Sequence, residues 1–236
     1  MPGLAERLEQ VQVGIADAAR AASRDPAGIT TVVVTKFHPA SLVRELYGLG
    51  IRDFGESRHQ EAGPKASELA DLDATWHFVG QLQSKKARQA REYISVLHSL
   101  DRQSLLDALT LDSLTLDSAS ATAADPRALD VFIQVNLTDD PQRGGVAPVE
   151  LEATAERVAA TSGLTLLGLM VVAPLGAAPQ RAFATLRVLS DRVQATVPAA
   201  SALSMGMSGD YREAILEGAT HLRIGTAITG NRPLAG

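Results

Sequence analysis

The strongest constraint on the fold of this chain is a regular alternation between short β-branched runs and longer amphipathic stretches. Eight segments have the pattern of strands, at residues 30–35, 51–54, 75–79, 94–97, 129–136, 164–172, 202–204 and 221–224. Helical patterns lie between them, at residues 41–49, 58–69, 148–160, 179–197 and 210–217. Strict alternation implies parallel strands with right-handed crossovers, and eight such units fit a closed barrel better than an open sheet. The sequence therefore predicts an α/β fold, a (β/α)8 barrel of the TIM type.

Two segments lie outside this repeat. A helix expected at residues 4–22 precedes the first strand and is predicted to plug or flank the barrel. Residues 119–128, rich in Ala, Asp and Pro, are expected to form one mobile loop. No composition shift or linker divides residues 1–236, so we expect a single domain, at a length that such barrels commonly fill. An open doubly wound sheet is the alternative fold, because periodicity does not reveal closure.

Composition narrows the classes of function. The chain has no cysteine, which removes disulfides, thiolate catalysis and cysteine-ligated zinc. A formal net charge of -5 gives no electrostatic reason to expect a nucleic acid or an anionic membrane as partner. The first residues are already charged, and Thr165, Gly168 and Pro174 interrupt the longest apolar stretch. We therefore expect no signal peptide and no membrane span, and a cytoplasmic location.

Several familiar site patterns are missing. The five histidines, at positions 38, 59, 77, 98 and 221, form no pair at i,i+3 or i,i+4 spacing, so no metal site is expected. The sequence contains no G-x-S-x-G, no P-loop and no G-x-G-x-x-G. His77 falls in the third predicted strand, where it is either satisfied in the barrel interior or lines the pocket.

Lys36 is the first candidate for chemistry, because the site of such a barrel lies at the carboxyl ends of its strands. It follows the first predicted strand and is one of only four lysines, beside 18 arginines. Lysine forms imines with aldehydes, and partial burial would lower its pKa towards the neutral amine that attacks carbonyls. A strand-end lysine that extends into solvent is the alternative interpretation.

Two other strand ends predict a phosphate site. Gly225 and Thr226 follow the last strand, where barrel enzymes often bind phosphate with backbone N–H groups at a short helix start. Ser208 follows the seventh strand and could direct its hydroxyl at the same anion, because the two loops are adjacent in a closed barrel. A glycine required only by the turn is the structural alternative. Asp210 is expected to cap the next helix, with Glu213 at capping-box spacing.

A basic cluster offers a weaker signal. Lys85, Lys86, Arg88 and Arg91 lie at a predicted helix start, where cations oppose the helix dipole and would attract an anionic partner. A solvated surface is the ordinary explanation for such a cluster.

Ordered motifs between residues 32 and 232 carry a family resemblance. They are Val34-Thr35-Lys36 with Pro39, Phe54-Gly55-Glu56 with Gln60-Glu61, Trp76-His77-Phe78-Val79-Gly80-Gln81-Leu82-Gln83, Ile133-Gln134-Val135-Asn136, Gly168-Leu169-Met170, Leu203-Ser204-Met205-Gly206-Met207-Ser208, and Arg223-Ile224-Gly225-Thr226-Ala227-Ile228 with Gly230 and Arg232. Together they resemble the pyridoxal phosphate homeostasis proteins, whose barrel is similar to the amino-terminal domain of alanine racemase.

The resemblance implies a site for pyridoxal 5'-phosphate (PLP). It makes Lys36 the imine lysine, places Arg223 beside the pyridine nitrogen, and makes Ser208, Gly225 and Thr226 the phosphate-binding residues. Ser57 would lie near the cofactor. The chain departs from the family at Ser57 and at Lys85, where asparagine is usual, so the contacts around Ser57 are the part of the site that the resemblance specifies least.

The implied function is PLP binding in intracellular vitamin B6 homeostasis rather than catalysis. A guanidinium at Arg223 disfavours a proton on the pyridine nitrogen and so weakens the ring as an electron sink. The chain ends at Gly236, so we expect it to lack the second domain that supplies the opposing base in alanine racemase. The partners implied are PLP and the PLP-dependent apo-enzymes that receive it. The alternatives are a weak racemase or related PLP enzyme, and a scaffold that binds a partner through residues 85–91.

Overall fold

The structure is a computed structural model, and it describes residues 2–110, 128–138, 140, 143–174, 176 and 178–231. Two features expected from the sequence lie outside these residues, namely Arg232 of the last motif and residues 119–127 of the expected loop.

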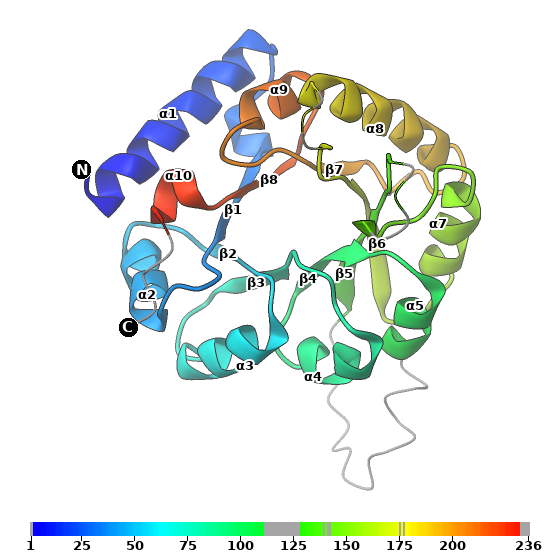
Figure 1. The fold of residues 1–236 in the computed structure, drawn as a ribbon, viewed down its shortest axis with the longest axis horizontal. Coiled ribbons are helices and arrows are strands. Elements are labelled where there is room, and N and C mark those ends of the chain that lie inside the picture. Colours follow the sequence, from blue (N-terminus) through cyan, green and yellow to red (C-terminus); the bar gives the residue numbers. More distant parts are fainter. Residues whose placement is uncertain are drawn as a thin grey trace, which may run out of the picture.

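The strands form a closed parallel barrel (Figure 1). They are β1 (Thr30–Val34), β2 (Asp53–Glu56), β3 (Thr75–Phe78), β4 (Val96–Leu100), β5 (Leu129–Gln134), β6 (Leu164–Met170), β7 (Ala202–Ser204) and β8 (His221–Ile224). Each strand pairs with its sequence neighbour, and β8 pairs with β1 in a register that matches Thr30 with His221. The prediction of a (β/α)8 barrel is confirmed, and the open-sheet alternative is wrong.

Helices form an outer ring around these strands (Figure 1). They are α1 (Leu4–Ala21), α2 (Ala40–Gly48), α3 (His59–Glu68), α4 (Ala87–Arg91), α5 (Gln103–Leu109), α7 (Leu151–Ala159), α8 (Pro179–Gln194), α9 (Tyr211–Leu216) and α10 (Thr226–Thr229). The extra helix α1 packs against α9 and α10, so it flanks the barrel and does not plug it. Its buried side chains include Leu4, Leu8, Val11 and Ile15, a spacing that places them on one helical face. Within the described residues, no helix combines the length and apolarity that a membrane span requires.

Two strands begin and end later than their apolar patterns predicted. Strand β2 runs to Glu56 instead of residue 54, and β4 runs from Val96 to Leu100 instead of 94–97. The added residues include the buried polar side chains of Glu56, His98 and Ser99. Polar groups that are buried through hydrogen bonds to other strands leave no hydrophobic pattern, so local periodicity missed these strand ends.

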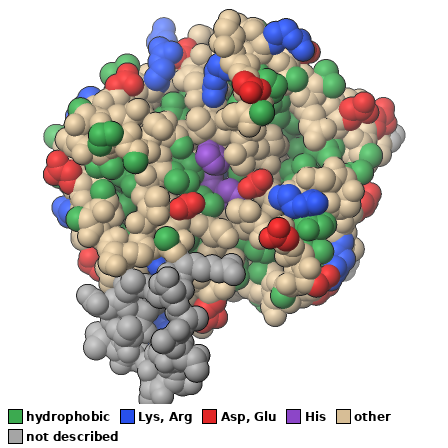
Figure 2. Space-filling view, turned by 180° about the vertical axis from the view of Figure 1, so that it is seen from behind, with side chains coloured by type: hydrophobic (Ala, Val, Ile, Leu, Met, Phe, Trp, Pro, Cys, Tyr) green, Lys and Arg blue, Asp and Glu red, His purple; other side chains and the backbone are tan. Residues whose placement is uncertain are grey.

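The barrel interior is partly polar. Val96, Phe132 and Met170 form a small apolar cluster that is separate from the main core between strands and helices. His77, His98, Ser204 and Arg223, which come from β3, β4, β7 and β8, are also buried. On the face opposite to that of Figure 1, histidine side chains lie at the centre with acidic side chains beside them (Figure 2). The centre of the barrel is therefore a place for hydrogen bonds as well as apolar packing.

Candidate functional site

A cavity of about 390 Å³ lies at the carboxyl ends of the strands. Its wall comes from residues in or directly after β1, β2, β3, β6, β7 and β8, namely Val34, Lys36, Ser57, Val79, Gly80, Val172, Met207, Ser208, Gly209, Arg223, Gly225 and Thr226. All six residues that the sequence singled out, Lys36, Ser57, Ser208, Arg223, Gly225 and Thr226, are in this wall. The fold brings them together because parallel strands share one carboxyl edge.

Lys36 lies in a turn directly after β1. Its side chain is exposed, so the partial burial that the sequence suggested is not observed. The reason is the turn itself, in which Phe37 adopts a positive φ of 67° and the chain leaves the strand before reaching α2. The Lys36 amine therefore lines the cavity while remaining accessible from outside it.

A second lysine, the buried Lys65, supports this turn, and it was not predicted from the sequence. Lys65 Nζ on α3 donates hydrogen bonds to the Thr35 carbonyl oxygen at 3.0 Å and to Glu56 Oε1 at 2.5 Å. The Thr35 hydroxyl donates to the same Glu56 oxygen at 2.7 Å. Lys65 and Glu56 are only 7% and 1% exposed, so the turn rests on a buried ion pair. The scarcity of lysine in this chain was the signal that could have indicated Lys65.

Two carboxylates next to this turn have different environments. Glu61 Oε2 accepts a hydrogen bond from the Phe37 backbone N–H at 3.1 Å, which supports the residue with the positive φ. Glu56 Oε2 is buried without a hydrogen-bond partner. Burial raises the pKa of Glu56, although Lys65 opposes this shift. Glu56 and Glu61 thus orient the Lys36 turn, and neither lines the cavity.

Gly80 allows the loops after β2 and β3 to touch. A Cβ atom at Gly80 would lie 2.3 Å from the Ser57 carbonyl oxygen, a distance at which the backbone must move. Ser57 therefore lies in the cavity wall because its neighbour has no side chain. Gly80 was not among the site residues predicted from the sequence. Its position two residues after β3, at the carboxyl end of a strand, could have indicated it.

Arg223 supplies a buried cation to the cavity wall. Its Nη1 donates to Ser204 Oγ at 2.7 Å and its Nη2 to the Val171 carbonyl oxygen at 2.9 Å. Burial lowers the pKa of Arg223 to about 10, with Asp210 acting in the opposite direction, so the guanidinium stays protonated at neutral pH. The charged residues in the wall are Lys36 and Arg223, and both are cationic.

The loops after β7 and β8 meet as predicted. Ser208 Oγ accepts a hydrogen bond from the Ala227 backbone N–H at 3.2 Å, which joins the two loops beside the cavity. Gly225 has a φ of -108°, and a Cβ there would lie 3.7 Å from Val34 Cβ. The space around Gly225 therefore does not by itself require glycine at this position.

The predicted capping role of Asp210 is wrong. Asp210 occupies the N-cap position of α9, but its side chain makes no cap hydrogen bond. Its Oδ1 instead accepts from the Met207 backbone N–H at 2.6 Å. The carboxylate closes the turn that carries Ser208 and is directed away from the helix start.

The basic cluster at residues 85–91 does not form one uniform surface. Arg91 donates to the carbonyl oxygens of Leu109 at 3.2 Å and Gly163 at 2.8 Å, so it joins α4 to the end of α5 and to the residue before β6. Lys86 Nζ donates to Gln89 Oε1 at 3.0 Å. Arg91 and Lys86 are therefore engaged in contacts within the protein. This weakens the hypothesis that residues 85–91 bind a partner as a scaffold.

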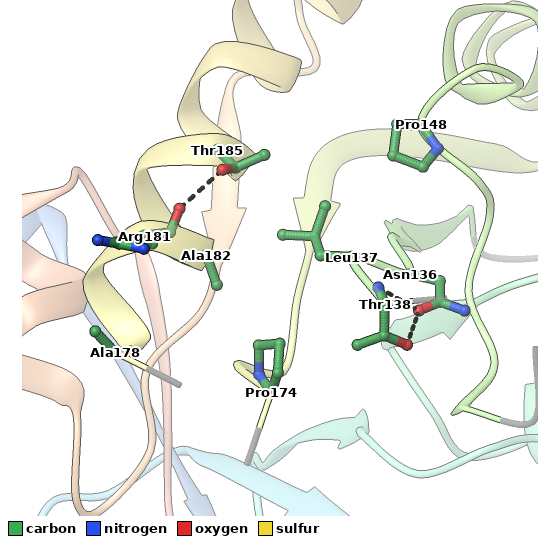
Figure 3. Close-up of a pocket in the computed structure, with 9 residues that line it drawn as sticks. All are labelled: Asn136, Leu137, Thr138, Pro148, Pro174, Ala178, Arg181, Ala182 and Thr185. Atoms are coloured by element: carbon green, nitrogen blue, oxygen red, sulfur yellow. Dashed lines mark hydrogen bonds between the residues drawn. The ribbon is translucent and has the colours of Figure 1, made fainter. Parts of the chain in front are cut away.

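A second cavity, of about 410 Å³, lies near the ends of β5 and β6 and the start of α8 (Figure 3). Proline, leucine and alanine side chains supply much of its wall. The Thr138 hydroxyl donates to Asn136 Oδ1 at 2.7 Å, and the Thr185 hydroxyl donates to a carbonyl of its own helix. None of the predicted site residues lines this cavity, whereas all six line the first one, which is therefore the candidate functional site.

The first cavity suits a small anionic carbonyl compound. Its volume is within the usual range for small ligands, roughly 300–1000 Å³. Lys36 offers a primary amine, Arg223 a fixed positive charge, and Ser208 and Thr226 offer hydroxyl groups. The wall residues contain no carboxylate that would repel an anion.

Comparisons with known proteins agree with this geometry. The sequence matches the family described as "Alanine racemase, N-terminal domain" over residues 12–233. It is 42% identical over 235 residues to the pyridoxal phosphate homeostasis protein of Pseudomonas aeruginosa, covering 98% of this chain and 97% of that protein. The protein of the same name from Corynebacterium glutamicum is 38% identical over 213 residues, or 90% of this chain and 95% of that one.

Solved structures show the same relationship. PipY of Synechococcus elongatus, solved with PLP bound, has a TM-score of 0.79 at 37% identity, over 97% of this chain and 100% of PipY. Alanine racemase from Corynebacterium glutamicum has a TM-score of 0.67 at 16% identity, over 97% of this chain and 63% of that one. The second likeness is one of fold.

Proposed function

The chain belongs to the family of the alanine racemase N-terminal domain, and from that premise we propose that it binds PLP and serves intracellular PLP homeostasis. One observation carries the proposal. A single cavity combines the amine of Lys36, the guanidinium of Arg223 and the joined loops of Ser208 and Thr226, in a chain 37% identical to a protein solved with PLP bound.

Each wall residue has a chemical task in this proposal. PLP, when bound, supplies an aldehyde that condenses with a lysine amine. Lys36 binds it covalently as an imine, and Arg223 faces the ring nitrogen and keeps that nitrogen unprotonated. Ser208, Gly225 and Thr226 bind the phosphate from two loops, and Ser57 borders the ring. The two cations match the negative charge of the ligand.

The accessibility of Lys36 favours exchange over catalysis. An exposed amine at the cavity wall is open to incoming and outgoing aldehydes, which suits a protein that holds and releases PLP. We propose PLP-dependent apo-enzymes as the recipients of the released PLP. We also propose the cytoplasm as the location of the protein. Mixing the PLP-loaded protein with such an apo-enzyme should restore the activity of that enzyme faster than mixing with the Lys36→Ala variant and equal total PLP.

Borohydride trapping tests the proposed function directly. The purified protein mixed with PLP should show imine absorbance, and reduction should fix a pyridoxyl group on Lys36, located by peptide mass mapping. Lys36→Ala should remove the absorbance and still unfold cooperatively, because an exposed side chain contributes little to the core. A label on Lys65, Lys85 or Lys86 would overturn the assignment.

A further inference from the structure

Arg223 contacts its surroundings through uncharged acceptors, although it is a buried cation. Its terminal nitrogens donate to the Ser204 hydroxyl and to the Val171 carbonyl. A buried charge requires compensation, which is usually a nearby opposite charge. Asp210 supplies an opposite charge that acts on Arg223, and the hydrogen bonds beyond Ser204 show how the guanidinium is oriented.

A hydrogen-bonded chain crosses the barrel from Arg223 to its amino-terminal end. Ser204 Oγ lies 2.7 Å from His98 Nδ1, His98 Nε2 lies 2.9 Å from His77 Nδ1, and His77 Nε2 lies 3.0 Å from Asp53 Oδ1. The members come from β8, β7, β4, β3 and β2, and Asp53 is the first residue of β2. Asp53 has a side chain that is 33% exposed, so the chain ends at solvent.

The hydrogen bonds of this chain can all run in one direction. A carboxylate only accepts, so His77 carries a proton on Nε2, and a neutral His77 ring then accepts at Nδ1. His98 therefore donates from Nε2 and accepts at Nδ1 from the Ser204 hydroxyl. Burial lowers the pKa of His98 well below its ordinary value, which keeps the ring neutral as this pattern requires. All the hydrogen bonds thus point from the cation at Arg223 to the anion at Asp53.

The ring of His98 is also held from the side. It stacks on Phe132 with centroids 4.7 Å apart and planes 25° apart. Phe132 in turn meets His221 edge-on at 5.0 Å. The apolar contact fixes the imidazole plane, so the two ring nitrogens stay aligned with Ser204 and His77. Hydrogen bonds arranged head to tail in a buried site polarise one another.

We propose that Asp53, His77, His98 and Ser204 are positioning residues that orient Arg223 towards the cavity. The proposal rests on the proposed function for its effect on PLP. A carboxylate in direct contact with the ring nitrogen would promote its protonation, whereas a guanidinium held in place by these hydrogen bonds disfavours it.

The hydrogen-bonded chain from Arg223 to Asp53, called the relay from here on, can be tested without PLP. In the unliganded protein, nitrogen-15 NMR of labelled histidine should show His77 and His98 as neutral Nε2–H tautomers. Asp53→Asn should perturb both histidine signals, including that of His98, which does not touch Asp53. Different tautomers, or an effect confined to His77, would overturn the proposal.

The PLP-loaded protein provides the second measurement, the pH midpoint of imine absorbance. Asp53→Asn should shift that midpoint by about half a pH unit, because the hydrogen bonds that orient Arg223 lose their anionic end. Asp73→Asn is the control, since Asp73 is an exposed aspartate in the loop before β3 and is not a member of the relay. The pH midpoint of imine absorbance in this control variant should move by less than half as much as in Asp53→Asn.

A double-mutant cycle separates the relay from simple charge. If the relay transmits the effect, Asp53→Asn should cause no further shift once Ser204→Ala has broken the chain. Additive shifts, or equal shifts for Asp53→Asn and Asp73→Asn, would overturn the inference. His98→Gln serves as the chain break if Ser204→Ala does not fold. Absence of imine absorbance in the unmodified protein would instead mean that the proposed function fails, and the histidine tautomers would still decide the relay.

Discussion

Lys65 Nζ donates a hydrogen bond to the main-chain carbonyl of Thr35, the residue immediately before Lys36, at 3.0 Å. One buried lysine therefore fixes the turn that carries another, exposed one. The same ammonium is paired with Glu56, which is buried at the end of β2. The position of Lys36 thus depends on an ion pair that contributes nothing to the cavity wall.

Breaking this pair should strongly destabilise the protein. Lys65→Met leaves the Glu56 carboxylate buried without a counter-charge, which should cost about 3–5 kcal/mol of unfolding free energy. Adding Glu56→Leu should recover part of that loss, because no buried charge then remains. Urea denaturation of both variants measures this. The control is Lys85→Met at an exposed lysine, expected within about 0.5 kcal/mol of the unmodified protein. A Lys65→Met variant as stable as that control would show that the pair is not structural.

Buried histidines should make stability fall in acid. Burial lowers the pKa of His221 from 6.5 to about 4 and also lowers that of His98 well below its ordinary value. The unfolded chain takes up these protons first, so stability is full above pH 6.5 and decreases as the pH falls towards about 4. Each histidine contributes a slope of up to about 1.4 kcal/mol per pH unit in this window. Denaturation between pH 7 and pH 4 measures the unfolding free energy, which should depend less steeply on pH in His221→Gln than in the unmodified protein. An equally steep dependence would contradict the assignment.

The phosphate residues should discriminate between two forms of the ligand. A hydrogen bond to a charged group contributes about 1.5–3 kcal/mol, so Ser208→Ala or Thr226→Val should weaken PLP binding roughly ten- to a hundredfold. Unphosphorylated pyridoxal is the control, because it can react with Lys36 but has no phosphate. Equilibrium titration of each variant with both compounds measures the difference. Equal losses for the two compounds would mean that these hydroxyls do not bind phosphate.

Gly80 and Gly225 should respond differently to alanine. A Cβ at Gly80 would lie 2.3 Å from the Ser57 carbonyl oxygen, so Gly80→Ala should displace the loop, lower stability and weaken PLP binding. A Cβ at Gly225 would meet only ordinary contacts with Val34, so Gly225→Ala should be tolerated. A larger side chain, in Gly225→Leu, should fill the phosphate site and reduce PLP binding without unfolding the barrel. Thermal denaturation and PLP titration of both alanine variants measure the difference. Equal stability and equal PLP affinity of the two variants would contradict this geometry.

Racemisation of amino acids should be negligible. A racemase requires a second acid or base opposite the lysine, and the wall residues include no His, Tyr, Asp or Glu. The Arg223 guanidinium also disfavours the ring protonation that makes PLP a strong electron sink. Exchange of the alanine α-hydrogen in deuterated water, followed by proton NMR, is a sensitive assay. Turnover within the usual enzyme range of roughly 1–1000 per second would favour the racemase alternative.

The sequence alone was sufficient for the barrel and for six residues of the cavity wall. Strand and helix periodicities are local properties, and their alternation implies parallel strands whose carboxyl ends share one edge. Lys36, Ser208, Gly225 and Thr226 were identifiable because each follows a strand, and the structure places all of them around one cavity. The family motifs added Ser57 and Arg223 to that set.

Only the tertiary structure decided how those residues are held. Lys65 and Thr35 are 30 positions apart in the chain, and His98 and Ser204 are 106 apart, so no local pattern links them. Their side chains are polar yet buried, which is favourable only when a partner from another strand satisfies them, and that partner exists only after the barrel closes. The same reason explains the misplaced ends of β2 and β4. Hydrophobic periodicity reports which residues leave water, whereas the hydrogen bonds of a buried polar network are set by three-dimensional proximity alone.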